Sequence, residues 1–293
     1  MNKISGILLP VDFSERCLGM THYARTLAEK YDAEIILLHV VNPVFVAPEV
    51  GMAPAAVVTT PTWLINEKYK LMDDFATSEL VGLRVRRFVY EGIPEAQIEE
   101  MANANEVQLV MMPTHGYGAF RRFLIGSVTA KVLDDVACPV FTGVHMEKHA
   151  YDSKEEFPTI ACAVDLKTGS HETLLSAAKL ANDFGSKLGV IHACPPPGKG
   201  ALGNPADLKP QLEDLVLSKL QEKFLNFAAE RLVCCVDNGD IAPTICAFAE
   251  RIGAKMLVVG RRHGSEKRAT GDGRLAGHSY SIIRQSPCPV LSI

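Results

Sequence analysis

The amino-acid sequence predicts an α/β protein built from two tandem copies of one domain, each a doubly wound, parallel, five-stranded sheet of the Rossmann-like class. Three observations lead to this prediction. Patterns of buried strands alternate with helix patterns along the chain, an order typical of parallel sheets with right-handed crossovers. The same order occurs twice. The chain, at 293 residues, also exceeds the usual size of one hydrophobic core.

The duplication is visible as a regular spacing between matching residues. Residues 8–12 match 161–165 at a spacing of 153 positions, and residues 138–140 match 288–290 at a spacing of 150. The spacing changes only across expected loops, where insertions are tolerated. We therefore expect a first domain at 1–147 and a second at 156–293. A charged, polar linker at 147–156 is expected between them.

Each element of the first copy has its own signal. The apolar run 7–11 is typical of a parallel strand covered on both faces. Apolar residues then recur every three or four positions from Met20 to Tyr31, which indicates one face of a helix. The other expected strands are 35–41, 85–90, 109–112 and 139–142. The other expected helices carry Leu64, Leu71 and Phe75, then Ile98, Met101 and Ala102, and the last begins near Gly126. A Pro- and Gly-rich flap is expected at 43–61, and the second copy's long helix is expected to carry Leu217, Leu220, Phe224, Phe227 and Ala228.

Composition excludes several classes of function. The chain is 47% hydrophobic and 22% charged, with a net charge of −4, so no overall field attracts nucleic acid or anionic lipid. No apolar stretch approaches the length needed to span a bilayer. The eight cysteines form no CxxC or Cys/His ligand pattern, which favours reduced, buried thiols over a metal site. We expect a cytoplasmic protein with neither a membrane nor a nucleic-acid partner.

The fold class directs attention to two segments of the first copy. In doubly wound sheets, ligands bind beyond the carboxyl ends of the strands, where the strand order reverses. Asp12 follows the first strand, and the loop from Pro113 to Ser127 follows the fourth. Gly116 lets the backbone approach a ligand closely, and a helix opening at Gly126 presents unpaired N–H groups that suit a phosphate. The hydroxyls of Ser127 and Thr129 add donors. A simple helix cap is the alternative reading of Gly126 and Ser127.

With these features the chain resembles the universal stress protein family in its tandem form. The family's loop runs Gly, two residues, Gly, nine residues, Gly and then Ser or Thr, and Gly116, Gly126 and Ser127 keep the nine-residue spacing. The segments 10–12 and 92–94 also match. The resemblance implies an adenine nucleotide alpha hydrolase-like fold that binds ATP or a related adenine nucleotide, with or without Mg. The contacts it implies are Asp12, Val41, Gly116, Gly126, Ser127, Val128 and Thr129.

Both copies depart from the family loop. Pro113 stands where the family has its first glycine, and proline removes a backbone N–H and fixes φ near about −65°. The second copy keeps Asp165, Gly260 and Gly264. Twelve residues instead of nine separate Gly264 from Gly277, and His278 replaces the Ser or Thr. The enlarged second loop is either a modified anion site or a solvated surface loop.

The functional expectation is a nucleotide-binding regulatory module of the stress response. No nucleophile–base pair is visible, which favours binding over catalysis. The alternatives are a slow ATPase or hydrolase, and an interaction scaffold that binds no nucleotide. His39 and His192 lie at equivalent places on apolar strands, which favours a structural role for both. The last strands, 139–142 and 289–292, are expected to pair the two domains within one chain. Pairing between chains, as a homodimer, is the alternative.

Overall fold

The computed structural model describes most of the chain, and all structural statements below concern these residues. The described ranges are 3–43, 60–104, 106–115, 125–144, 157–166, 170–195, 205–224, 229–261 and 274–293. The expected flap at 43–61, the loop residue Gly116 and the linker 147–156 fall largely or wholly outside them.

The elements of the first half alternate as expected from the hydrophobic pattern. They are β1 (Gly6–Pro10), α1 (Glu15–Tyr31), β2 (Glu34–Val41), α2 (Thr62–Asp74), β3 (Val85–Glu91), α3 (Pro94–Asn103), β4 (Leu109–Pro113), α4 (Ser127–Asp135) and β5 (Val140–Gly143). The second half repeats this order. Its elements are β6 (Thr159–Ala163), α5 (Ser170–Phe184), β7 (Lys187–Cys194), α6 (Pro205–Lys223), the 3-10 turn η2 (Ala229–Arg231), β8 (Leu232–Asn238), α7 (Ile241–Arg251), β9 (Met256–Val259), α9 (Arg274–Gln285) and β10 (Val290–Ser292).

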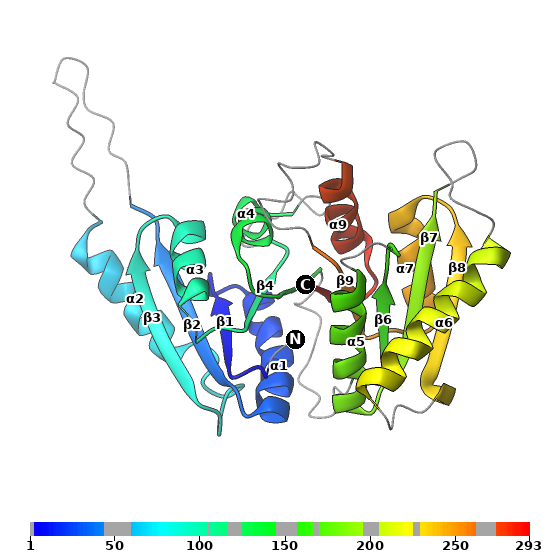
Figure 1. Cartoon of the computed structure of the whole chain (residues 1–293). Coiled ribbons are helices and arrows are strands. Elements are labelled where there is room, and N and C mark those ends of the chain that lie inside the picture. The colour runs from blue at the N-terminus through cyan, green and yellow to red at the C-terminus, as the bar shows by residue number, and fades with distance from the viewer. Residues whose placement is uncertain are drawn as a thin grey trace, which may run out of the picture.

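The two halves share one ten-stranded sheet, shown in Figure 1. The strand order is β3-β2-β1-β4-β5-β10-β9-β6-β7-β8, so each half has the doubly wound order that the sequence predicts. All pairs within a half are parallel. At the centre, β5 and β10 pair antiparallel with Leu291 opposite Phe141. Each final strand would be an edge of its own half, and this pairing satisfies backbone groups that an edge leaves open.

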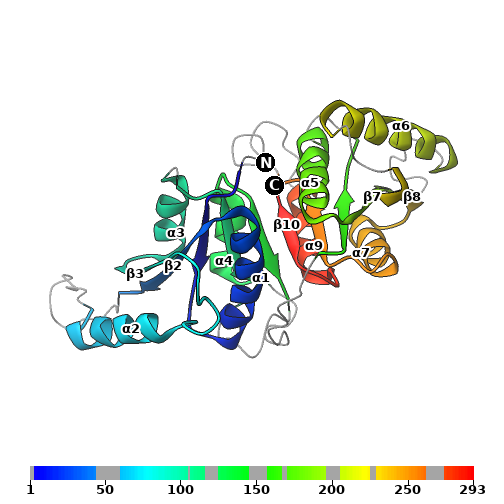
Figure 2. The ribbon, with the colours of Figure 1, turned by 90° about the horizontal axis from the view of Figure 1, so that it is seen from below.

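Helices cover both faces of the sheet, as the views in Figures 1 and 2 show. One face packs against α1, α2, α5 and α6, with Leu27, Met72 and Leu212 in its core. The other face packs against α3, α4, α7 and α9, with Ile98, Val132 and Ile283 in its core. Each core contains residues from both halves, because the central pair β5–β10 aligns the same faces of the two sheets.

Leu64 and Phe75 on α2, and Leu220 with Phe224 at the end of α6, pack in or against the core as expected, while one expected position on each helix is displaced; Phe227 and Ala228 lie outside the described residues. On α2, Leu71 is 39% exposed while the neighbouring Met72 is buried. On α6, the fully buried residues are Leu212, Val216 and Leu220, and Leu217 lies at the side of the helix. Both helices have apolar residues on adjacent positions, so periodicity alone leaves the rotation of the helix about its axis undecided by about 100°.

Side chains as well as strands connect the two halves. The Tyr31 hydroxyl donates to Asp183 Oδ2 at 2.8 Å, and Lys30 lies 5.4 Å from the centre of the Phe184 ring. Burial, and then the Asp183 carboxylate, raise the pKa of Tyr31, so this hydroxyl keeps its proton. The ring of Tyr23 in α1 stacks on Phe157 at 6.2 Å. α1 and α5 are thus joined by polar and aromatic contacts alongside the sheet.

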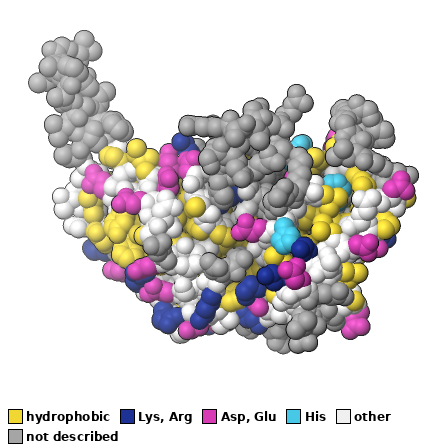
Figure 3. Space-filling view, viewed as in Figure 1, with side chains coloured by type: hydrophobic (Ala, Val, Ile, Leu, Met, Phe, Trp, Pro, Cys, Tyr) yellow, Lys and Arg dark blue, Asp and Glu magenta, His cyan; other side chains and the backbone are white. Residues whose placement is uncertain are grey.

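The surface carries charges of both signs, as the composition of the chain leads us to expect. In the face shown in Figure 3, Lys and Arg side chains lie among Asp and Glu side chains. Among the described helices, none has the length and apolar character that crossing a membrane requires.

Candidate functional site

The candidate site lies where the strand order of the first half reverses, between β1 and β4. Both strands are neighbours in the sheet, and β2 follows on the other side of β1. Asp12 comes two residues after β1, Val41 ends β2, and Thr114 follows β4 directly. Since carboxyl ends of parallel strands meet at one edge of the sheet, these three residues lie at the same edge. This edge is where doubly wound folds bind ligands.

Asp12 is fixed by the first turn of α1. Its Oδ1 accepts hydrogen bonds from the backbone N–H of Ser14 and from Cys17 Sγ, both at 3.0 Å. Within the described part of the chain, Oδ2 has no hydrogen-bond donor. Burial, and then the Asp12 charge, raise the pKa of Cys17 to about 12, so the thiol remains protonated beside the carboxylate. One oxygen of Asp12 therefore holds the turn, and the other lies at the strand end without a donor from the described residues.

His39 and His192 have the structural role that the sequence predicts. His39 Nδ1 bonds to the Val11 carbonyl oxygen at 2.8 Å, and His192 Nδ1 bonds to the Val164 carbonyl oxygen at the same distance. Each ring thereby ties the end of the second strand of its half to the end of the first. Burial lowers the pKa of His39, with the Val11 carbonyl acting in the opposite direction.

The start of α4 is attached to the end of β4 by two hydrogen bonds. The Gly126 N–H donates to the Thr114 carbonyl at 2.8 Å, and Thr129 Oγ1 donates to the Pro113 carbonyl at 3.1 Å. Thr129 is buried. The proton of this hydroxyl is therefore used within the fold, and a ligand contact by Thr129 stays a prediction. Pro113, which lacks an N–H, still contributes its carbonyl to this attachment.

Gly126 has a steric reason to be glycine. A Cβ at this position would lie 3.3 Å from the Thr114 carbonyl oxygen and 3.8 Å from Thr129 Oγ1. Its φ of −59° is open to any residue. Close packing of the helix start on the loop after β4 explains the glycine, and Gly126 is the N-cap residue of α4.

The first turn of α4 presents donors that no described residue uses. In the described part of the chain, the backbone N–H groups of Ser127, Val128 and Thr129 have no acceptor, and the first backbone bond of the helix is from Ala130 to the Gly126 carbonyl. Ser127 is exposed, so its hydroxyl adds a solvent-accessible donor at this turn. The positive end of the helix dipole lies at the same place. Such a turn suits an anion.

His115 is less exposed than expected for a histidine in a loop. Its Nδ1 lies 2.9 Å from Thr114 Oγ1, and its Nε2 is buried without a partner among the described residues. Burial and then the charge of Arg16 lower the pKa of His115, so the ring is neutral at pH near about 7. No periodic pattern in the sequence signals this burial, since it results from packing at the strand end.

The described residues of the second copy differ from this arrangement. Asp165 is exposed, and its carboxylate accepts a hydrogen bond from Ser170. A Cβ on Gly260 would lie 2.9 Å from Thr173 Oγ1. Gly264 lies outside the described residues. Gly277 lies inside α9, which begins at Arg274.

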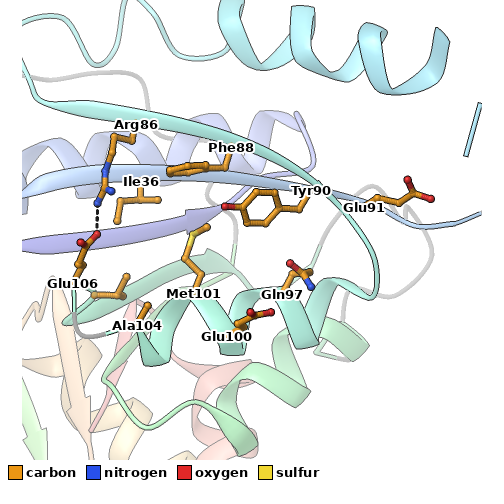
Figure 4. Close-up of a pocket in the computed structure, with 11 residues that line it drawn as sticks. Ile36, Arg86, Phe88, Tyr90, Glu91, Gln97, Glu100, Met101, Ala104 and Glu106 are labelled. Carbon is orange, nitrogen blue, oxygen red and sulfur yellow. Dashed lines mark hydrogen bonds and ion pairs between the residues drawn. The ribbon is translucent and has the colours of Figure 1, made fainter. Parts of the chain in front are cut away.

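A separate groove of about 610 Å³ lies at the outer edge of the first half, between β3 and α3 (Figure 4). Phe88 and Tyr90 line it from β3, and Met101 lines it from α3. Arg86, the cation of this groove, is bound by Glu34 at 2.8 Å and Glu106 at 2.7 Å. Further lining residues include Glu91 and Glu100. The excess of carboxylates makes the groove unfavourable for phosphate, and no residue of the expected nucleotide site lines it.

Comparisons with known proteins all point to the same family. The model of the universal stress protein family matches residues 4–142 and again 156–293. The universal stress protein MJ0531 of Methanocaldococcus jannaschii is 30% identical over 146 residues, which cover 47% of this chain and 81% of that protein. A crystal structure of a universal stress protein from Archaeoglobus fulgidus covers 98% of this chain and 95% of its own, with a TM-score of 0.69 and 22% identity. Another universal stress protein from Archaeoglobus fulgidus, solved in complex with dAMP, is 19% identical and covers 47% of this chain and 98% of its own, with a TM-score of 0.34.

Proposed function

Because the chain belongs to the universal stress protein family, we propose that its first half binds ATP or a related adenine nucleotide and acts as a regulatory module of the stress response. One arrangement carries the proposal. A carboxylate oxygen of Asp12 lies at the reversal point of the strand order, and so do the amides of the first turn of α4, which have no acceptor among the described residues. The first group accepts hydrogen bonds, and the second group donates them to an anion.

We propose specific roles for the residues around this point. Asp12 Oδ2 accepts hydrogen bonds from the ribose hydroxyls, and the buried Val41 packs against the nucleoside. The N–H groups of Ser127, Val128 and Thr129 hold the phosphates, together with the Ser127 hydroxyl. Gly126 keeps this turn close to the end of β4. Gly116 belongs to the proposed phosphate loop by its spacing in the sequence.

The two copies provide a matched test. Asp12→Asn keeps an Oδ1 acceptor for Ser14 and Cys17, while it removes the negative charge and replaces Oδ2 with a donor. Asp165→Asn is the equivalent change in the second copy. Isothermal titration of the full chain with ATP is expected to give about one site per chain. Asp12→Asn is expected to weaken ATP binding by about tenfold, equivalent to about 1.4 kcal/mol, and Asp165→Asn to leave it unchanged. Equal effects of both substitutions, or two equal sites, would contradict the proposal.

We propose binding without rapid turnover. Phosphoryl transfer requires positioned metal ligands, an oriented water and a cation, and the described end of β4 and start of α4 present backbone donors for a ground-state phosphate. A colorimetric assay of phosphate release from ATP is expected to show no release above the buffer rate. Release that is abolished by Ser127→Ala would support the ATPase alternative. Normal folding with no binding of ATP would support the scaffold.

We also propose that the halves 1–147 and 156–293 pair within one chain in solution, in the manner of a fused dimer. The antiparallel contact of β5 with β10, together with the Tyr31–Asp183 hydrogen bond, supports this arrangement. Fusion raises the effective concentration of each half for the other. Light scattering after size exclusion is expected to give the mass of one chain. A dimer that dissociates when residues 288–293 are deleted would instead show pairing between chains.

A further inference from the structure

Arg261 extends from the second half of the molecule into the first. It follows β9 closely, and its guanidinium donates to three backbone carbonyls of the first half. Nη1 is 2.6 Å from the Leu133 oxygen and 3.4 Å from the Val132 oxygen, and Nη2 is 2.6 Å from the Cys138 oxygen. Val132 and Leu133 belong to the last turn of α4. One side chain therefore connects the end of α4 to the turn that leads into β5.

The charge of Arg261 suits the end of a helix. Helix C-termini carry partial negative charge and unpaired carbonyls, which a cation stabilises. Burial lowers the pKa of Arg261 to about 10, with Cys138, Asp134 and Tyr280 acting in the opposite direction, so the guanidinium stays charged at neutral pH. Truncating Arg261 is costly, because the carbonyls of Leu133 and Cys138 lose this donor, whereas the Val132 carbonyl still accepts from the Val136 N–H at 3.1 Å.

A second residue of the second half holds the middle of the same helix. The Tyr280 hydroxyl, on α9, donates to the Ala130 carbonyl at 2.9 Å. Burial, and then the neighbouring Asp134 carboxylate, raise the pKa of Tyr280, so this hydroxyl keeps its proton. α4 and α9 lie close to each other near the centre of the molecule in Figure 1. Arg261 thus contacts the last turn of α4, and Tyr280 contacts Ala130, the residue that directly follows Thr129 of the first turn.

The position of Arg261 in the repeat is informative. The Thr114 N–H donates to the Gly143 carbonyl, and the Arg261 N–H makes the equivalent bond to the Ile293 carbonyl. Thr114 and Arg261 are therefore structural counterparts at the end of the fourth strand of each half. In the first half this position adjoins the proposed phosphate-binding turn. In the second half the same position carries a long cation that contacts the other half.

We propose that Arg261 is a positioning residue for the nucleotide site of the first half, assisted by Tyr280. By holding the last turn and the middle of α4, the second half sets where the first turn of α4 meets the phosphates. The second copy of the loop has thereby changed from a site of its own to a support for its neighbour's site. This inference rests on the proposed nucleotide binding for its effect on affinity, and on the structure alone for its effect on α4.

The test compares ATP with adenosine, since only ATP uses the first turn of α4 for its phosphates. Arg261→Met keeps much of the apolar length of the side chain and removes the donors. Isothermal titration of the full chain is expected to show ATP binding weakened by about tenfold and adenosine binding changed by less than about twofold. Arg261→Lys, which keeps the charge without the two-armed donor geometry, is expected to restore part of the loss. Tyr280→Phe provides a milder variant with a smaller loss in the same direction.

Arg87→Met is the matched control. Arg87 Nε donates to the Met72 carbonyl at 3.0 Å and Nη2 to the Phe75 carbonyl at 3.3 Å, so it performs the same task at the end of α2. This control is expected to reduce stability without changing the ratio of ATP to adenosine affinity. An equal loss for both ligands in Arg261→Met, or an unchanged ATP affinity, would overturn the inference.

Hydrogen exchange of the nucleotide-free protein separates this inference from the proposed function. Amides of α4 are expected to exchange about tenfold faster in Arg261→Met than in the parent, and at the parent rate in Arg87→Met. Unchanged exchange in α4 would overturn the positioning role even if ATP binds. The opposite outcome is also informative. If the parent protein binds neither ATP nor adenosine, the proposed function is refuted. If α4 nevertheless exchanges faster in Arg261→Met, the positioning of α4 by Arg261 still holds.

Discussion

Replacing Thr129 with valine tests whether its hydroxyl serves the fold or the ligand. The hydroxyl is buried and donates to the Pro113 carbonyl at 3.1 Å. Valine has nearly the same shape but no donor, so the carbonyl loses a partner at a cost of about 1–3 kcal/mol. The buried methyl group that replaces the hydroxyl recovers part of this cost. We expect the free energy of unfolding to fall by about 1–2 kcal/mol.

Urea denaturation of the full chain, followed by circular dichroism, measures this change in unfolding free energy. Titration with ATP measures whether the substitution also changes the affinity for the nucleotide. Thr129→Ser keeps the donor and is expected to retain most of the stability. Thr21→Val is the control, because the Thr21 hydroxyl is also buried but bonds within its own helix, to Leu18 at 2.6 Å. Its removal is expected to cost less. If Thr129→Val kept the parent's stability and lost ATP binding, the assignment of this hydroxyl to the fold would be refuted.

Three further substitutions test the junction and the strand ends. Phe141→Ala removes a fully buried ring opposite Leu291 and is expected to cost about 3–5 kcal/mol of unfolding free energy in urea; a cost below about 1 kcal/mol would mean that β5 is not part of a shared core. Thr142→Val replaces a buried hydroxyl without a described partner and is expected to stabilise by about 1 kcal/mol, measured in the same way, whereas a loss would indicate a hidden partner. His39→Asn tests the pH dependence of stability. Burial lowers the pKa of His39, so the unfolded chain binds a proton more readily than the folded chain. The stability of the parent therefore falls as the pH drops through about 6.5. The variant is expected to lose less stability between about pH 7 and about pH 5, and identical pH profiles would contradict this.

Much of the site could be predicted because it depends on local and repeated features. The position of Asp12 after an apolar strand, and the glycine before the last helix of the copy, are both readable as spacings along the chain. His39 and His192 could be assigned to the fold because the repeat places both on equivalent strands. The hydrogen bond from the Thr129 hydroxyl to the Pro113 carbonyl could not be predicted, since it joins residues on different elements that no spacing brings together.

The sequence by itself determined the duplication, the alternation of strands and helices, and the edge of the sheet where a ligand is expected. These features follow from hydrophobic periodicity, which acts over a few residues and is recorded directly in the chain. Only the tertiary structure decided the rotation of α2, the helix start that leaves Gly277 inside α9, and the destination of Arg261. Those outcomes depend on which buried carbonyls and faces meet across distances of many residues, and the need to satisfy such groups is set by their arrangement in space.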